Sequence, residues 1–148
     1  MPLRYASILV IGLLCAAGAA ADTPAAPGTL TLSEKSARRF PQPVRVGDLI
    51  GRRVLEPVPA QPVLGRVAAI VRNPQGRIDV VVRFGGLLGL GSRPIAVPVE
   101  AVALLGEHVA VLDFTPDQLN AFPSASADGG TALPADERIR VGLTKPFH

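Results

Sequence analysis

Hydrophobic and polar residues alternate along short stretches in the middle of the chain, and no helical spacing of apolar residues persists there. A two-residue period is typical of strands with one buried face. The pattern predicts strands, separated by turn residues, at 49–55, 63–72, 77–84, 95–99 and 109–113. Several short strands at this spacing indicate an all-β fold, either a small barrel or a sandwich.

One short helix is predicted after these strands. Thr115 is a suitable N-cap, Pro116 suits the first helical position, and Gln118 can complete a capping box. Pro123 ends the helix. Small polar residues then predict a flexible loop. The alternating stretch 138–143 is either an extra edge strand or a loosely attached tail.

The amino-terminal residues have the pattern of a secretory signal peptide. Arg4 precedes an apolar run, and an Ala-x-Ala sequence ends at Ala21. The apolar run is short for a membrane-spanning helix, which needs about 20 residues. We therefore expect residues 1–21 to be removed by cleavage after Ala21. The mature protein would then be periplasmic or secreted, without stable insertion in a membrane.

The composition narrows the chemistry of the mature chain. The only cysteine, Cys15, and the only tyrosine, Tyr5, both lie in the signal segment, and the chain has no tryptophan. Cleavage therefore leaves no disulfide or thiolate and weakens any surface for stacking bases or sugars. The full chain has a formal net charge of +3, and removal of Arg4 with the signal peptide would leave +2, so we expect no nucleic-acid partner.

Residues 22–43 are rich in alanine, proline, threonine and serine and show no clear period. This composition predicts a flexible linker between the signal peptide and the folded domain. Lys35, Arg38 and Arg39 would then be solvated charges. The alternative is a weak contact with anionic lipid head groups.

A glycine-rich run could form either a phosphate-binding loop or a turn. The dinucleotide fingerprint G-x-G-x-x-G lies between a strand and a helix, whereas the run here has the order G-x-x-G-x-G and precedes a predicted strand. A P-loop would also need a lysine after the last glycine. We therefore predict a structural turn between strands, and no cofactor. The turn glycines are Gly85, Gly86, Gly89 and Gly91.

The order of short motifs over residues 44–123 resembles the PRC-barrel domain family. The motifs are, in order, GDLIGRRV, LGRV, NPQG, GGLLGLG, IAVP and LDFTPDQL. The resemblance implies a small, strongly bent β-barrel of about six strands, here with one short C-terminal helix. Family members include a domain of the photosynthetic reaction centre H subunit and a domain of a ribosome maturation factor. The resemblance to this family also implies a role in protein–protein contact and assembly. Residues 124–148 would form a C-terminal tail.

The hairpin 63–72/77–84 presents a candidate protein interface. Strict alternation places Arg66 opposite Arg83, and Arg72 opposite Arg77, on its outer face. The predicted outer-face residues are Arg66, Ala68, Ile70, Arg72, Arg77, Val81 and Arg83. Like charges directly opposite each other destabilise a sheet, and arginine is enriched at interfaces. The alternative is a solvated exterior whose apolar centre is covered by the chain's own C-terminal helix or strand.

The sequence gives little support for catalysis. Ser92 lies in LGSRP, not in a G-x-S-x-G motif, so a triad of Ser92, His108 and Asp113 is not supported. His108 and His148 alone do not make a metal site. We expect a non-enzymatic interaction or assembly module of the bacterial envelope with a protein partner. The alternative is a periplasmic carrier of a small apolar ligand inside the barrel. The sequence leaves the oligomeric state open.

Overall fold

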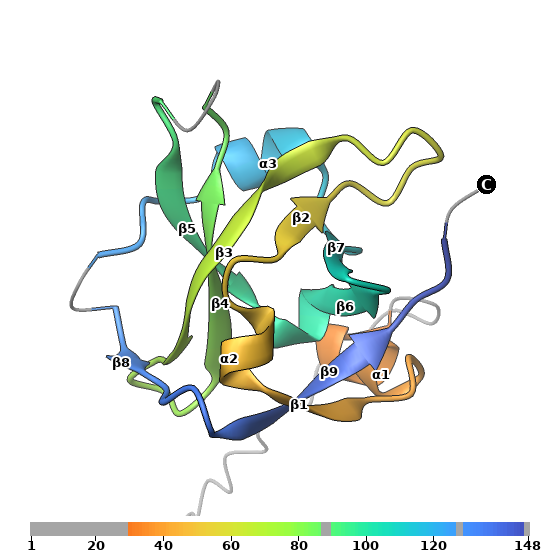
Figure 1. Cartoon of the computed structure of the whole chain (residues 1–148), viewed down its shortest axis with the longest axis vertical. Coiled ribbons are helices and arrows are strands. Elements are labelled where there is room, and N and C mark those ends of the chain that lie inside the picture. Colours follow the sequence, from red (N-terminus) through yellow and green to blue (C-terminus); the bar gives the residue numbers. More distant parts are fainter. Residues whose placement is uncertain (1–29, 87–89, 127–128, 147–148) are drawn as a thin grey trace, which may run out of the picture.

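A computed structural model of the chain describes residues 30–86, 90–126 and 129–146 (Figure 1). The predicted signal peptide, Gly89 and His148 lie outside the described residues. The elements in chain order are α1 (Leu32–Ala37), β1 (Gln42–Arg45), α2 (Val46–Leu49), β2 (Arg53–Leu55), β3 (Val63–Arg72), β4 (Ile78–Phe84), β5 (Arg93–Pro98), the 3-10 helix η1 (Val99–Ala101), β6 (Val102–Leu105), β7 (His108–Val111), α3 (Pro116–Asn120), β8 (Thr131–Ala132) and β9 (Arg138–Leu143).

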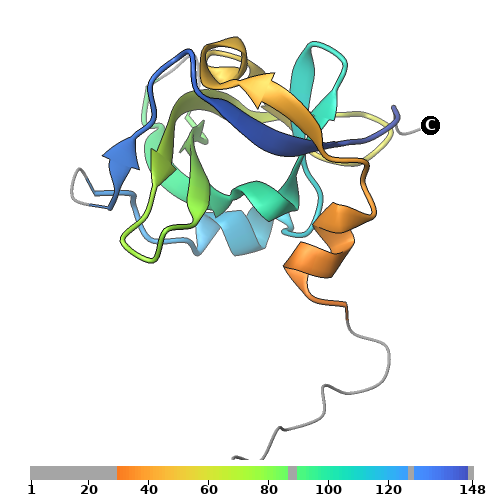
Figure 2. The ribbon, with the colours of Figure 1, turned by 90° about the horizontal axis from the view of Figure 1, so that it is seen from below.

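The strands form one bent sheet in the order β1-β9-β6-β7-β2-β3-β4-β5, and β8 pairs with β3. Most neighbours are antiparallel, but β2 runs parallel to β7, and β6 runs parallel to β9. Figure 2 shows the strands curving around the interior. The all-β prediction is confirmed. The prediction of a closed barrel of about six strands is wrong, because the sheet has nine strands and its ends, β1 and β5, do not pair in the described chain.

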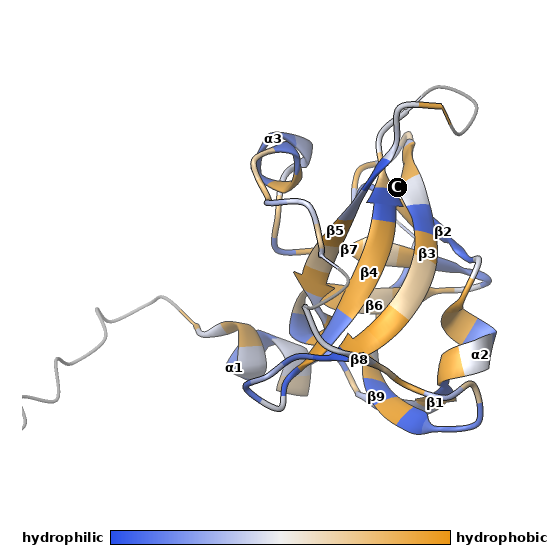
Figure 3. Ribbon diagram, turned by 90° about the vertical axis from the view of Figure 1, so that its left-hand side faces the viewer, coloured by the Kyte–Doolittle hydropathy of each residue, from blue (hydrophilic) through white to orange (hydrophobic). Residues whose placement is uncertain are grey.

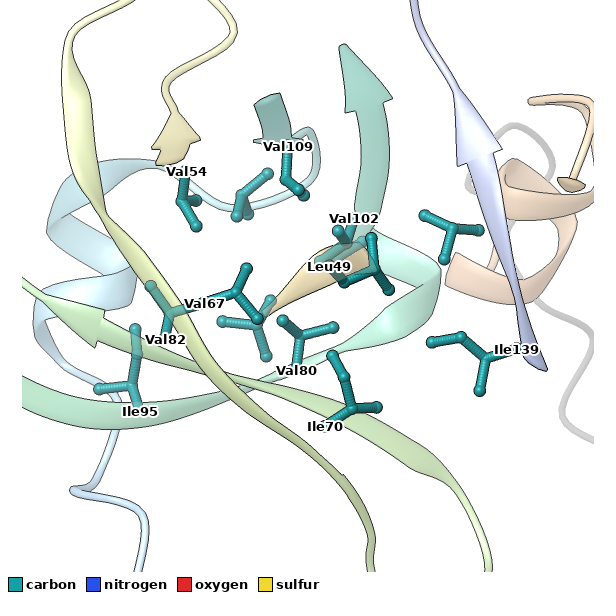
Figure 4. Close-up of a cluster of buried hydrophobic side chains, with 14 of the residues drawn as sticks. Leu49, Val54, Val67, Ile70, Val80, Val82, Ile95, Val102, Val109 and Ile139 are labelled. Carbon is teal, nitrogen blue, oxygen red and sulfur yellow. The ribbon is translucent and has the colours of Figure 1, made fainter. Parts of the chain in front are cut away.

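The interior of the bent sheet is filled by one cluster of buried apolar side chains (Figure 4). Its members come from α2, α3 and strands far apart in the sequence. The labelled examples are Leu49, Val54, Val67, Ile70, Val80, Val82, Ile95, Val102, Val109 and Ile139. Burying such side chains contributes roughly 1.5–3 kcal/mol each, which makes this cluster the main source of stability.

The predicted strands match the structure to different degrees. β3 has the predicted bounds, β4 begins one residue later than predicted, and Thr115 and Gln118 form the predicted capping box of α3. The predicted strand 49–55 is instead the end of α2 followed by the short strand β2. The stretch 138–143 is a strand, β9, which pairs with both β1 and β6.

A β-bulge changes which face of β3 is buried. The register of β3 against β4 shifts between Val67 and Ala69, so that Val67 and Ile70 both point into the core. A bulge inserts one extra residue and reverses the alternation beyond it. The predicted outward position of Ile70 is therefore wrong, since its side chain is only 1% exposed. Arg66 is opposite Arg83 as predicted, but Arg72 is opposite Ile78 instead of Arg77.

The segment predicted as a linker contains regular structure from Thr31 onwards. Thr31 and Glu34 form a capping box at the start of α1. After α1 the chain enters β1, which pairs with β9 along four residues. The six-residue helix α1 has no fully buried residue, so it lacks the apolar stripe that would have revealed it in the sequence.

Candidate interface on the outer face of the sheet

Three exposed arginines stand side by side on the outer face of neighbouring strands. Arg53 of β2 is the register partner of Arg66 of β3, and Arg66 is the register partner of Arg83 of β4. Each has a neighbouring valine on its own strand that points into the core, so all three arginines point outward. Side chains directly opposite each other have Cβ atoms about 4.5–5.5 Å apart. We call these three residues the arginine row.

The charges of the arginine row are not neutralised within the described part of the chain. No carboxylate there lies within 4.0 Å of the three guanidinium groups. Arg66 Nη1 donates a hydrogen bond to the carbonyl oxygen of Gly51, at 3.1 Å. Like charges in direct opposition destabilise a sheet, so carboxylates supplied by a partner would relieve a cost that the free protein bears.

A shallow hollow of about 390 Å³ lies at the end of the arginine row, between β3, β4 and the turn after β4. Its lining residues include Arg66, Arg83 and Gly65. Two exposed apolar side chains lie in the same region: Val63 lines the hollow and is 55% exposed, and Leu90, in the turn, is 79% exposed. The region therefore combines positive charge with apolar surface, as protein interfaces do.

Glycine is required where β3 and β4 approach each other beside the hollow. A Cβ atom on Gly65 would lie 2.0 Å from the carbonyl oxygen of Arg83, well inside contact distance. In the turn that follows β4, the backbones of Gly85, Gly86 and Gly91 have φ angles of 74°, 81° and 74°. These positive values are readily accessible only to glycine. The turn lies between β4 and β5, where the sequence predicted it.

The structure does not bring the four arginines of the predicted interface together. Arg66 and Arg83 lie at one end of the β3–β4 hairpin. Arg72 and Arg77 lie at the other end, about 20 Å away for six residues of extended strand. Arg72 forms an ion pair with Glu137, with Nη2 and Oε1 2.9 Å apart. The predicted interface is therefore divided into two separate pairs of arginines, one at each end of the hairpin.

The chain's own C-terminal segment crosses part of the predicted face (Figure 3). The backbone N–H of Ala125 donates to the carbonyl oxygen of Pro94 at 2.7 Å, and β8 pairs with the end of β3. Val81 faces this segment and lines the space beneath it, whereas Ala68 is half-buried at the bulge. A cavity of about 280 Å³ remains between segment and sheet. Its lining consists of Ala69, Val71, Val81, Ala96, Ala125, Ser126, Gly129, Gly130 and Ala132.

Arg53 was missed by the sequence analysis. The residue lies in a stretch correctly expected to contain a strand, but nothing in the sequence indicated that this strand pairs with β3. The pairing, which includes a register shift between Val54 and Leu55, is what aligns Arg53 with Arg66. An arginine repeated on three predicted strands was the only available signal.

Both edge strands of the open sheet contain proline, and the edge of β5 is also occupied by a bridge between Ile95 and Ser124. The edge strand β1 contains Pro43, and the edge strand β5 contains Pro94 and Pro98. Proline has no N–H to donate to an added strand, and edge prolines are a common defence against strand addition. A partner is therefore more readily accommodated by side chains on the face of the sheet than by pairing at its edges.

A buried ion pair fastens α1 and the chain after it to the sheet. Arg39 Nη2 donates to Oδ1 of Asp113 at 3.0 Å, and Arg39 Nη1 lies 2.8 Å from Oδ2. The second contact is an ion pair without hydrogen-bond geometry. Lys35 Nζ lies 3.3 Å from Oδ1, and Arg39 Nη1 also donates to the carbonyl oxygen of Glu100 at 3.0 Å. Arg39 and Lys35 are thus bound to Asp113, unlike the solvated charges that the sequence predicted.

The pKa of Asp113 reflects two opposing influences. Burial alone would raise the pKa of this carboxyl group, but the hydrogen bond and charge of Arg39, assisted by Lys35, hold the pKa below its ordinary value. Asp113 is therefore ionised and paired at neutral pH. Its side chain stabilises the docking of α1 through Lys35 and Arg39.

The chain gives no match when it is compared with models of known protein families or with curated proteins. In residues 30–86, 90–126 and 129–146, no three metal-binding side chains gather into a group. No helix in the same ranges is long and apolar enough to cross a membrane.

Proposed function

We propose that this protein is an exported interaction module of the PRC-barrel type, with an open sheet, which binds an acidic partner protein in the bacterial envelope. The observation that carries the proposal is the arginine row, in which three guanidinium groups stand in direct register without a carboxylate among the described residues. The order of motifs over residues 44–123 and the strong bend of the sheet support the family assignment. The amino-terminal pattern supports export.

The partner would contribute carboxylates to the arginine row and an apolar group to the surface beside it. A guanidinium group can bind a carboxylate through two parallel hydrogen bonds, a geometry that fixes orientation as well as charge. Val63 and Leu90 would supply the apolar contact that excludes water around these ion pairs. The proline-containing edges of the sheet favour this mode of binding over strand addition.

The proposal is tested by capture of the partner from an envelope extract. The full chain carries a C-terminal affinity tag and is produced in its source, so that any maturation takes place. One variant combines Arg53→Glu, Arg66→Glu and Arg83→Glu. A matched control makes the same charge change elsewhere, with Arg77→Glu, Arg138→Glu and Arg140→Glu, because none of these three arginines lies within 4.0 Å of a carboxylate in the described chain.

We expect to find a partner protein that is captured by the parent protein and by the control variant, but not by the variant of the arginine row. Loss from both variants would indicate a general effect of net charge, and retention by the row variant would place the interface elsewhere. Either result would contradict the proposal. Circular dichroism of each variant checks that the fold is retained.

A second candidate function is that of carrier for a small apolar ligand. The core cluster fills the interior of the sheet, so the ligand would not lie there. The cavity of about 280 Å³ on the outer face favours this function, because alanine, valine and glycine line most of it. Toluene is a suitable probe, followed by NMR chemical-shift changes. The shifts should disappear when Ala96→Leu fills the cavity, and their absence in the parent would refute this candidate.

A further inference from the structure

A second group of arginines surrounds a groove at the opposite end of the hairpin from the arginine row. Arg72 and Arg77 reach the groove from the β3–β4 end, and Arg138 and Arg140 reach it from β9. The groove has a volume of about 620 Å³ and is also lined by residues of α1, including Ser36. Figure 2 shows α1, β9 and the β3–β4 turn around this side of the molecule. Four arginines from two regions far apart in the sequence thus line one groove.

The arginines of β9 are held on the groove side by the pattern of burial. Ile139 and Val141 are 3% and 1% exposed and point into the core, so Arg138 and Arg140 point away from it on one face. Alternate residues on a strand are about 6.6 Å apart. The two guanidinium groups can therefore contact one small ligand together.

The groove carries a net positive charge. Arg72 is neutralised by Glu137 at 2.9 Å. In the described chain, no carboxylate lies within 4.0 Å of the guanidinium groups of Arg77, Arg138 and Arg140. Glu100 is the one acidic residue among those that line the groove. Three unpaired cations against one carboxylate leave an excess of about two positive charges, which matches a doubly charged anion.

We propose that this groove binds a small phosphate-bearing anion. A phosphate monoester carries a charge of about −1.5 to −2 at neutral pH and has three acceptor oxygens, whereas a carboxylate carries one charge and two oxygens. Guanidinium groups bind phosphate oxygens through paired hydrogen bonds, and Ser36, which also lines the groove, carries a hydroxyl group that can donate. The groove is open to solvent and is lined by arginines from two separate regions of the chain, so a small ligand can reach several guanidinium groups.

The phosphate group can belong to a free small molecule or to a lipid head group, and the experiment distinguishes these sources. The protein is produced in its source, so that any maturation takes place. It is titrated with inorganic pyrophosphate by calorimetry, and separately mixed with vesicles containing phosphatidylglycerol in a sedimentation assay. The test variant is Arg138→Gln with Arg140→Gln. The control variant is Arg53→Gln with Arg66→Gln, which removes the same charge from the arginine row.

Pyrophosphate binding that weakens at least tenfold in the test variant and less than twofold in the control supports a free phosphate compound as the ligand. Vesicle binding with the same dependence, without pyrophosphate binding, supports a lipid head group. Equal weakening in both variants, or no binding by the parent to either probe, overturns the proposal. If the test variant fails to fold, Arg77→Gln alone serves, with an expected weakening of about threefold to tenfold.

Discussion

Removal of the Asp113 carboxylate is expected to loosen the attachment of α1. The side chain of Asp113 is 7% exposed, and that of its main partner Arg39 is 17% exposed. Breaking a buried ion pair by removing one partner typically costs about 3–5 kcal/mol, because the other charge stays buried without compensation. In Asp113→Ala, Arg39 keeps its hydrogen bond to the carbonyl oxygen of Glu100, which lowers that cost. The contact of Lys35, whose side chain is 39% exposed, adds less than about 1 kcal/mol.

We therefore expect Asp113→Ala to lower the free energy of unfolding by about 3 kcal/mol. Urea unfolding followed by circular dichroism measures this change from the shift in midpoint. A double-mutant cycle with Arg39→Ala isolates the pairwise interaction, for which we expect a coupling of about 1.5–3 kcal/mol. A coupling below about 0.5 kcal/mol would refute the conclusion that this pair holds α1 to the sheet.

The same pair predicts how stability depends on pH. Because the pKa of Asp113 is lower in the folded protein than in the unfolded chain, the ionised carboxylate stabilises the fold above its unfolded pKa of about 3.9. That contribution is lost as the pH falls through the lower folded pKa. Asp113→Asn should therefore flatten the loss of stability below about pH 4. An unchanged acid limb in unfolding measured between about pH 2 and 5.5 would contradict this reasoning.

Three further substitutions test separate parts of the fold. Gly65→Ala should destabilise by about 1–3 kcal/mol, because its Cβ would lie 2.0 Å from the carbonyl oxygen of Arg83 and must push the strands apart; thermal unfolding measures this loss. Ile70→Ala should cost about 2–5 kcal/mol in urea unfolding, whereas a small loss would contradict the burial that the bulge gives this residue. Arg93→Ala should cost about 1–2 kcal/mol and speed amide exchange in α3, because Arg93 donates to the carbonyl oxygens of Leu119, Asn120 and Phe122.

Elements with strong local signals could be predicted from the sequence. The hairpin strands have long alternating runs and a turn at Asn73–Gly76, and α3 has a complete capping box before a terminating proline. Such features depend on residues close together in the chain, so the chemistry of those residues is sufficient to predict them.

Features that depend on distant contacts could not be predicted in the same way. The bulge near Ala68 has no marker in a run of small apolar residues, and it moved Ile70 from the expected outer face into the core. The docking of α1 depends on Asp113, far along the sequence. Only part of the candidate site could be predicted from the sequence. Arg66 and Arg83 share one hairpin and could be paired by local rules, whereas Arg53 and Arg138 join their clusters only through the tertiary fold.

The pairing of the first strand with the last has a consequence for the order of folding. Gln42 of β1 is the register partner of Val141 of β9, about 100 residues later in the chain. β1 therefore has no partner strand until residues 138–141 have been synthesised, and closing so large a loop slows folding. During synthesis, β1 would stay unpaired and exposed to proteases and holding chaperones. Completion of β9 would then act as the step that commits the chain to its native state.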